Sequence, residues 1–176
     1  QVKMGTRQVG STAKPFTYAV AIDNGFSPCF QVPNVPLTIG SGQYAWTPRG
    51  ESVGSPITLR KALAHSQNFA TAYMINEVGA RSVATLTKRM GITSDVPEYP
   101  SIALGAYEAS VYDMVGAYSA FVNHGVWVEP TYILRIEDKN GMPIYEKAPR
   151  VSKVLNSESA YIMVDMLKSV VDGGSG

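Results

Sequence analysis

The sequence lacks the features that define several large classes of protein. Its 176 residues include one cysteine, Cys29, which excludes an internal disulfide and a zinc site built on cysteines. The longest apolar candidate run, residues 16–22, is far shorter than the roughly 18 residues that a membrane helix needs. The 15 basic and 14 acidic residues leave a net charge of +1, without a basic face or charge run. We therefore expect no binding of nucleic acid and no direct attachment to an anionic membrane surface.

What remains is the composition of a globular domain. Hydrophobic residues make up 45% of the chain and charged residues 16%, and the length is sufficient for one sizeable core. The sequence has no signal peptide; it begins with Gln1 and ends in the glycine-rich segment 172–176. We expect both ends to continue in a longer protein.

The spacing of apolar residues predicts mostly helices. Pro15 cannot donate a backbone hydrogen bond to Ser11, so a helix through residues 16–22 must begin near Ser11. Residues 26–56, rich in proline and glycine, predict a long ordered loop, and Asn140-Gly141 predicts a β-hairpin between 132–138 and 142–146. The fold class expected is α+β, dominated by helices with a small hairpin. The other predicted helices span residues 56–64, 69–78, 82–90, 110–123 and 157–171.

Ser11 and Lys14 form a candidate nucleophile and base. Serine is a weak nucleophile until a base accepts its proton, and no Ser-His-Asp arrangement is readable in this sequence. A spacing of three places both side chains on one helix face. The free N–H groups at a helix start also suit a developing oxyanion. The alternative is an ordinary helix start, with Ser11 as a cap and Lys14 as a solvated charge.

Ser66-Gln67-Asn68 is a second candidate segment. Residues two apart do not share a helix face, so Ser66 and Asn68 reach one cleft only if they lie in a turn between helices. The predicted helices over 56–64 and 69–78 place a break there. The alternative is a turn that only caps a helix.

The residues around these motifs resemble a known family. Arg7-Gln8 before Ser11 and Pro15-Phe16 after Lys14 are similar to the active-serine segment of class A penicillin-binding proteins, which are bifunctional peptidoglycan synthases. Their superfamily carries Ser-x-x-Lys, a Ser-x-Asn type motif and Lys-Thr-Gly. The sequence departs from the family at Val9, which replaces a proline, and in having no Lys-Thr-Gly. Further stretches that resemble the family, in its order, are 46–48, 58–64, 103–105, 108–110, 117–125 and 170–176.

The resemblance implies a fold, a reaction and a role for each site residue. Residues 1–176 would be a partial transpeptidase domain: the mostly helical portion of the serine transpeptidase and β-lactamase-like fold, truncated at both ends and without most of the central sheet. Ser11 would attack the D-Ala-D-Ala amide of a peptidoglycan stem peptide, with Lys14 as base. Ser66 would relay the proton to the leaving amine, and Asn68 would hold the substrate amide. No metal or organic cofactor is implied, and β-lactam antibiotics would acylate Ser11.

The resemblance also implies a location and leaves alternatives. The parent protein would act at the periplasmic face of the inner membrane, held by an N-terminal anchor absent from this chain. The chain alone would be inactive, because the cleft wall carrying Lys-Thr-Gly is missing. One alternative is another serine acyl-enzyme of the superfamily, a D,D-carboxypeptidase or a β-lactamase. A second is a non-catalytic binding or scaffold domain with this fold.

Overall fold

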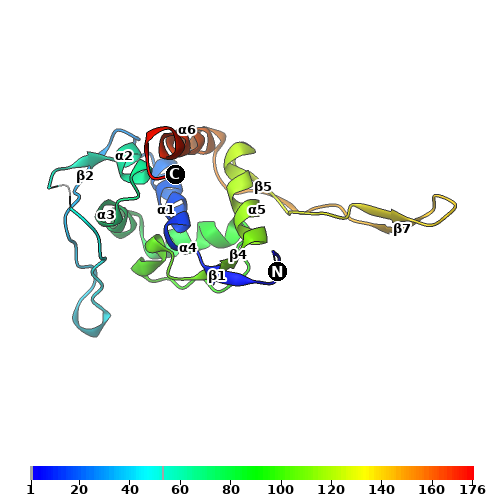
Figure 1. Ribbon diagram of the computed structural model, residues 1–176, viewed down its shortest axis with the longest axis horizontal. Helices are drawn as coiled ribbons and strands as arrows, with labels where there is room; N and C mark the ends of the chain where they lie inside the picture. The colour runs from blue at the N-terminus through cyan, green and yellow to red at the C-terminus, as the bar shows by residue number, and fades with distance from the viewer. Residues whose placement is uncertain (1, 53) are drawn as a thin grey trace.

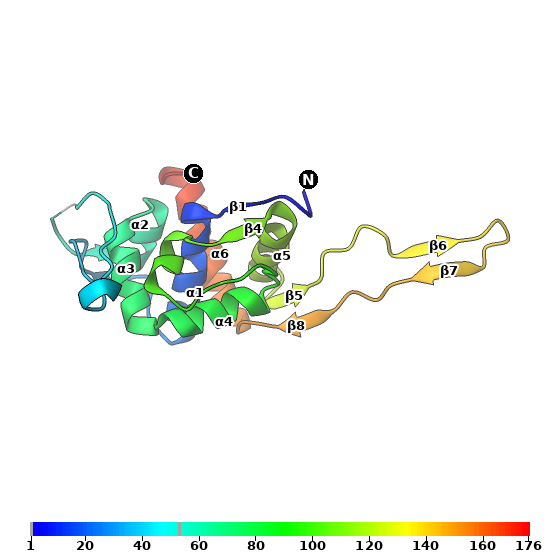
Figure 2. The same cartoon turned by 90° about the horizontal axis from the view of Figure 1, so that it is seen from below.

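The computed structural model describes residues 2–52 and 54–176, and it has the predicted helix-dominated α+β architecture. The helices form a body from which one pair of strands projects (Figures 1 and 2). Within the described ranges, none of the helices is both long and apolar enough to cross a membrane. The helices are α1 (Lys14–Asp23), α2 (Leu59–Ala64), α3 (Asn68–Val78), α4 (Ala80–Arg89), α5 (Val111–Val122) and α6 (Ser157–Gly173).

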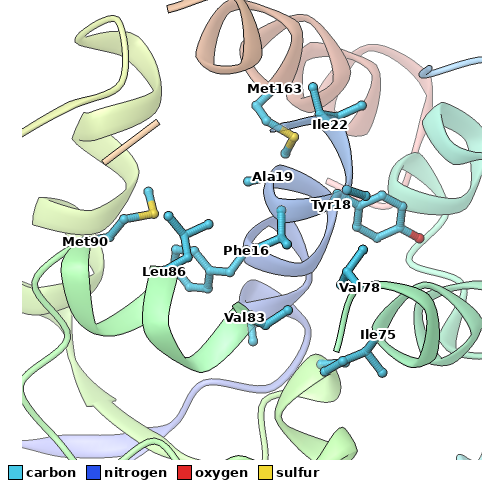
Figure 3. Packing of buried hydrophobic residues seen from close by; sticks show 14 of the residues in the cluster. Phe16, Tyr18, Ala19, Ile22, Ile75, Val78, Val83, Leu86, Met90 and Met163 are labelled. Carbon is cyan, nitrogen blue, oxygen red and sulfur yellow. The ribbon is translucent and has the colours of Figure 1, made fainter. Parts of the chain in front are cut away.

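Helix α1 lies at the centre of the body. All its residues from Lys14 to Ile22 are buried, because α2, α3, α4 and α6 pack around it. Figure 3 shows Phe16 and Ile22 among side chains from neighbouring helices, including Leu86 of α4 and Met163 of α6. A helix enclosed on all sides is apolar all round, and α1 departs from this rule chiefly at Lys14. Because α1 is enclosed, the side chain of Lys14 lies in the interior of the protein.

Over residues 2–52 and 54–176, the strands form four separate antiparallel pairs instead of one central sheet. The predicted hairpin is present, and it extends away from the helices (Figure 2). The pairs are β1 (Thr6–Gln8) with β4 (Glu108–Ser110), β2 (Gln31–Val32) with β3 (Ile57–Thr58), β5 (Val126–Val128) with β8 (Val151–Lys153), and β6 (Arg135–Glu137) with β7 (Pro143–Glu146). Three 3₁₀ turns are η1 (Gly10–Ala13), η2 (Gly42–Tyr44) and η3 (Pro100–Leu104).

Two predicted helix starts lie three residues before those of the structure, and the helix predicted from residue 82 begins at Ala80. The helix expected over 56–64 begins at Leu59, because the two residues before it pair with β2 and the Thr58 side chain caps the helix by accepting a hydrogen bond from Lys61 N. Ser11 lies in the 3₁₀ turn η1, and the α-helix begins at Lys14, whose N–H donates to Ser11 O. The sequence pattern located the turn but did not distinguish its 3₁₀ geometry.

Candidate active site

Lys14 is the buried centre of the site. Its residue is 1% exposed, and its Nζ donates to Ser66 Oγ at 2.8 Å, to Asn68 Oδ1 at 2.6 Å and to the Ser66 carbonyl oxygen. The three donors of an ammonium group are thus all used. Burial lowers the pKa of Lys14 from 10.5 to about 8, because desolvation penalises the charged form. An amine with this pKa is suited to act as a general base near neutral pH.

The turn between α2 and α3 presents Ser66 to this lysine. Ser66 has a φ of +53°, in the left-handed region that a residue with a side chain seldom adopts. Backbone hydrogen bonds from Ser66 N to Leu63 O (3.0 Å) and from Gln67 N to Ala62 O (2.8 Å) close the turn. Such backbone strain persists where surrounding contacts hold it, and Lys14 here holds both the hydroxyl and the carbonyl of Ser66.

Ser11 lies at the exposed edge of the same site. It borders, together with Lys14 and Ser66, a cavity of about 410 Å³. The cavity is completed by Tyr118 of α5, by apolar residues of α6 and by the segment that follows α6. The structure thus brings three of the four predicted site residues to one cavity.

Asn68, the fourth predicted residue, is joined to the site through Lys14. Its Oδ1 accepts the lysine hydrogen bond, and its Nδ2 donates to Arg49 O at 2.7 Å. Asn68 does not border the 410 Å³ cavity in the described part of the chain. Both ends of its amide are therefore engaged by protein groups, one of which belongs to the long loop 26–56.

The Ser11 turn is held from behind by residues outside the two motifs. Gly105 has a φ of +77°, and a Cβ there would lie 2.2 Å from Gly10 O, so only glycine fits. The Tyr118 hydroxyl donates to Thr12 O at 2.8 Å. Val9 N donates to Tyr107 O at 3.1 Å, a bond that the family's proline could not make. The glycine was visible in the sequence only as part of the family-like stretch 103–105.

The segment after α6 supports the other side of the cavity. Ser175 N donates to Ala64 O at 2.9 Å, two residues before Ser66. A Cβ on Gly174 would lie 2.2 Å from the same oxygen. This contact provides a partner for a carbonyl at the end of α2, where helices leave carbonyls unpaired. The glycine-rich segment is thus packed against the turn that carries Ser66.

Comparisons with known proteins agree with this geometry. The family described as penicillin binding protein transpeptidase domain matches residues 4–176. Penicillin-binding protein 2D of Bacillus subtilis is 32% identical over 175 residues, covering 94% of this chain and 25% of that protein. Penicillin-binding protein 1A of Aquifex aeolicus is 34% identical over 173 residues, covering 96% of this chain and 24% of that protein.

A solved structure shows the same fold. The crystal structure of penicillin-binding protein 1A from Haemophilus influenzae superposes with a TM-score of 0.88 at 24% identity, covering 99% of this chain and 31% of that one. The chain spans about a quarter of the length of the Bacillus subtilis and Aquifex aeolicus relatives.

Proposed function

The chain belongs to the family of penicillin-binding protein transpeptidase domains, and from this premise we propose that it is part of a D,D-transpeptidase that cross-links peptidoglycan stem peptides and binds penicillin. The observation that carries the proposal is the buried Lys14 amine, which is hydrogen-bonded to Ser66 and Asn68 and borders one cavity with Ser11. A desolvated lysine beside an exposed serine is the arrangement that serine activation without histidine requires.

The proposed first step is acylation of Ser11. Its Oγ attacks the carbonyl carbon of the amide between the two D-Ala residues, while the neutral Lys14 amine accepts the serine proton. The C–N bond then breaks, and the proton passes from Lys14 through Ser66 Oγ, 2.8 Å from the lysine nitrogen, to the leaving amine of the terminal D-Ala. The product is an ester on Ser11 and free D-Ala. Asn68 fixes the Lys14 amine through Oδ1, and its second Nδ2 hydrogen, which Arg49 O does not use, is proposed to hold the substrate amide.

The second step transfers the peptide to another stem peptide. An amine of that acceptor attacks the ester carbonyl, the new amide bond forms, and the C–O bond to Ser11 breaks. The serine oxygen recovers a proton from the attacking amine through Lys14. β-Lactams would acylate Ser11 by the first step, because their strained amide stands in for the D-Ala-D-Ala bond.

The chain supplies part of what this reaction needs. Its sequence has Ser-x-x-Lys and Ser-x-Asn but not Lys-Thr-Gly, which the superfamily uses as its third motif. The proposal is that residues 1–176 are the helical portion of a transpeptidase domain and are inactive without a strand carrying that motif. The parent protein would work at the outer face of the bacterial inner membrane.

Release of D-Ala tests the reaction. The full-length protein is incubated with a diacylated L-Lys-D-Ala-D-Ala peptide, with and without a D-amino acid as acceptor, and free D-Ala is measured. We expect release that is abolished in Ser11→Ala and acceptor product when the amine is added. Hydrolysis without acceptor product would instead indicate a D,D-carboxypeptidase. Rapid turnover of penicillin would indicate a β-lactamase. No release of D-Ala would indicate a binding or scaffold domain.

A further inference from the structure

A groove lies at the base of the projecting hairpin, apart from the Ser11 cavity. A cavity of about 540 Å³ borders α4, α5, β5 and β8, and a second of about 350 Å³ continues along the hairpin. The two share Lys3, Tyr112 and Pro130, so they form one elongated depression, here named the arm groove. Within the described residues, no residue that borders the arm groove also borders the Ser11 cavity. An elongated groove suits an extended ligand better than a small one.

The charge of the arm groove favours an anion. Five cationic side chains border it, against the two carboxylates of Asp113 and Glu129. Both carboxylates are already bonded: Asp113 accepts from Thr93 Oγ1 at 2.9 Å, and Glu129 accepts from Lys147 at 3.0 Å and Arg150 at 3.3 Å. The bordering cations are Lys3, Lys88, Arg89, Lys147 and Arg150.

Three of these cations, Lys3, Lys88 and Arg89, have no carboxylate partner within the described residues, and the Arg89 guanidinium donates to Lys153 O at 2.7 Å instead. Lys88 is exposed at the end of α4 and makes no ion pair there. Lys3 lies over aromatic rings instead, with its Nζ 5.4 Å from the Tyr112 ring centre and 5.8 Å from that of Tyr132. A ligand with carboxylates would therefore supply the missing counter-charges.

Aromatic rings give the same groove flat apolar surfaces. Tyr132 is 74% exposed and Tyr145 is 43% exposed, and both border the part along the hairpin. Trp127 borders the other part, but it is only 9% exposed and belongs to the core, so the exposed rings are those on the hairpin. Exposed rings that combine an apolar face with a polar tip are typical of binding surfaces. They suit a ligand made of rings with apolar faces, such as sugars.

We propose that the arm groove binds a glycan strand whose sugars carry carboxylates, at a site separate from the Ser11 cavity. The charge and the groove's length indicate an extended polyanion, and the rings favour sugars over a simple acidic peptide. The choice of a glycan from the cell wall rests on the proposed function, since peptidoglycan is the polymer on which that function acts. The groove would hold the strand while stem peptides reach Ser11.

Calorimetric titration tests the proposal. The probe is peptidoglycan glycan strands stripped of their stem peptides, which keep a carboxylate on each disaccharide and offer no D-Ala-D-Ala to the Ser11 cavity. We expect the purified full-length protein to bind them, with Kd rising as salt is added because the attraction is screened. A chitin oligosaccharide, which has sugars without charge, and polyglutamate, which has charge without sugars, should each bind about tenfold more weakly.

Matched variants assign the binding to the groove. Tyr132→Ala combined with Tyr145→Ala should raise Kd about tenfold, and Lys88→Ala about fivefold. Tyr161→Ala, at 75% exposure on α6, and Lys168→Ala, also exposed on α6, should leave Kd unchanged. The Lys88 change lies on a different element from the hairpin, so it tests the groove even if the tyrosine pair alters the hairpin.

Several results would overturn the proposal. These are no binding by the unaltered protein, an unchanged Kd in the groove variants, or equally tight binding of polyglutamate or of the chitin oligosaccharide. Loss of binding after saturation with penicillin would place the glycan in the Ser11 cavity and would also contradict it. Failure of penicillin to acylate Ser11 would count against the proposed function, but the groove titration would still report its own result.

Discussion

At the scale of single residues, the proposed chemistry depends mainly on Lys14. Its amine is desolvated, and its three hydrogen bonds go to the turn at residues 66–68. The protonated amine has no donor to spare, whereas the neutral amine has a lone pair free to take the proton of Ser11. Because burial lowers the pKa of Lys14 to about 8, the neutral fraction rises as pH increases from 6 to 9.

The rate of acylation should follow this titration. In the full-length protein, the second-order rate constant for fluorescent penicillin should rise through a midpoint near pH 8. Lys14→Arg should lower the rate at least about 100-fold at every pH in this range, since the guanidinium keeps its proton. Lys168→Arg, on the exposed side of α6, is the control and should keep the original profile. A rate that does not change with pH, or full activity in Lys14→Arg, would contradict the proposal that Lys14 is the base.

Gly105 illustrates how a residue without a reactive side chain can set the position of the turn that carries Ser11, the proposed nucleophile. Gly105→Ala places a Cβ 2.2 Å from Gly10 O at a φ of +77°, so we expect a loss of at least about 3 kcal/mol in the free energy of unfolding. Gly25→Ala, just after α1, is the matched control: its φ is +92°, and nothing lies within 4 Å of the added Cβ. It should cost only about 1 kcal/mol of backbone strain. Urea denaturation measures both, and equal losses would show that the contact with Gly10 is unimportant.

At the scale of elements, the β6–β7 hairpin is the part least tied to the body. The side chains of both strands are exposed, and the pair extends beyond the helices (Figure 1). Its base is anchored by the Glu129 contacts with Lys147 and Arg150, which lie outside the strands. We therefore expect that a change in the hairpin can alter glycan binding without altering the stability of the helical body.

Shortening the hairpin tests that separation. Lys147 N donates to Leu134 O at 2.9 Å, so an Asn-Gly turn can replace residues 135–146 between these two positions. We expect the free energy of unfolding to change by less than about 1 kcal/mol, because little apolar surface is buried there. Thermal and urea unfolding measure this, with penicillin acylation as a check on the Ser11 site. A loss above about 3 kcal/mol would mean that the hairpin is part of the cooperative core.

Helices with a clear apolar period could be predicted closely from the sequence. The expected helices over 110–123 and 157–171 correspond to α5 (Val111–Val122) and α6 (Ser157–Gly173). The apolar period of the local sequence predicted where both helices lie, but it did not predict the buried face of α5, where Val111 and Val115 are exposed and Ala117 and Ala120 are buried. The start of α2 was predicted three residues too early, because pairing of β3 with β2 depends on a segment some 26 residues away.

At the scale of the whole molecule, the site depends on contacts that no local pattern encodes. Ser11 and Lys14 are neighbours in sequence, but the Lys14–Asn68 bond joins residues 54 apart and the Tyr118–Thr12 bond residues 106 apart. The two motifs identified the candidate site residues, Ser11, Lys14, Ser66 and Asn68. They could not predict that Asn68 would also bind Arg49 O, or that Gly105 would back the nucleophile turn, because both follow from how α1, α3 and the loops pack.

The organisation of the molecule also explains why the motifs sit where they do. Helix α1 is enclosed by four other helices, so Lys14 in its first turn is buried, whereas Ser11 in the preceding turn η1 is exposed. The turn before α3 and the segment after α6 meet it from either side. The helical body thus holds Lys14, the proposed base, and Ser11, the proposed nucleophile, lies at its surface.

The central claim is that Ser11 is the nucleophile, and labelling by penicillin tests it most directly. The full-length protein, its Ser11→Ala variant and residues 1–176 alone are incubated with fluorescent penicillin, and the modified peptide is identified by mass spectrometry. We expect stoichiometric labelling of Ser11 in the full-length protein, none in Ser11→Ala, and little in residues 1–176, which lack Lys-Thr-Gly. Label on another residue of the full-length protein, or undiminished labelling of Ser11→Ala, would contradict the claim.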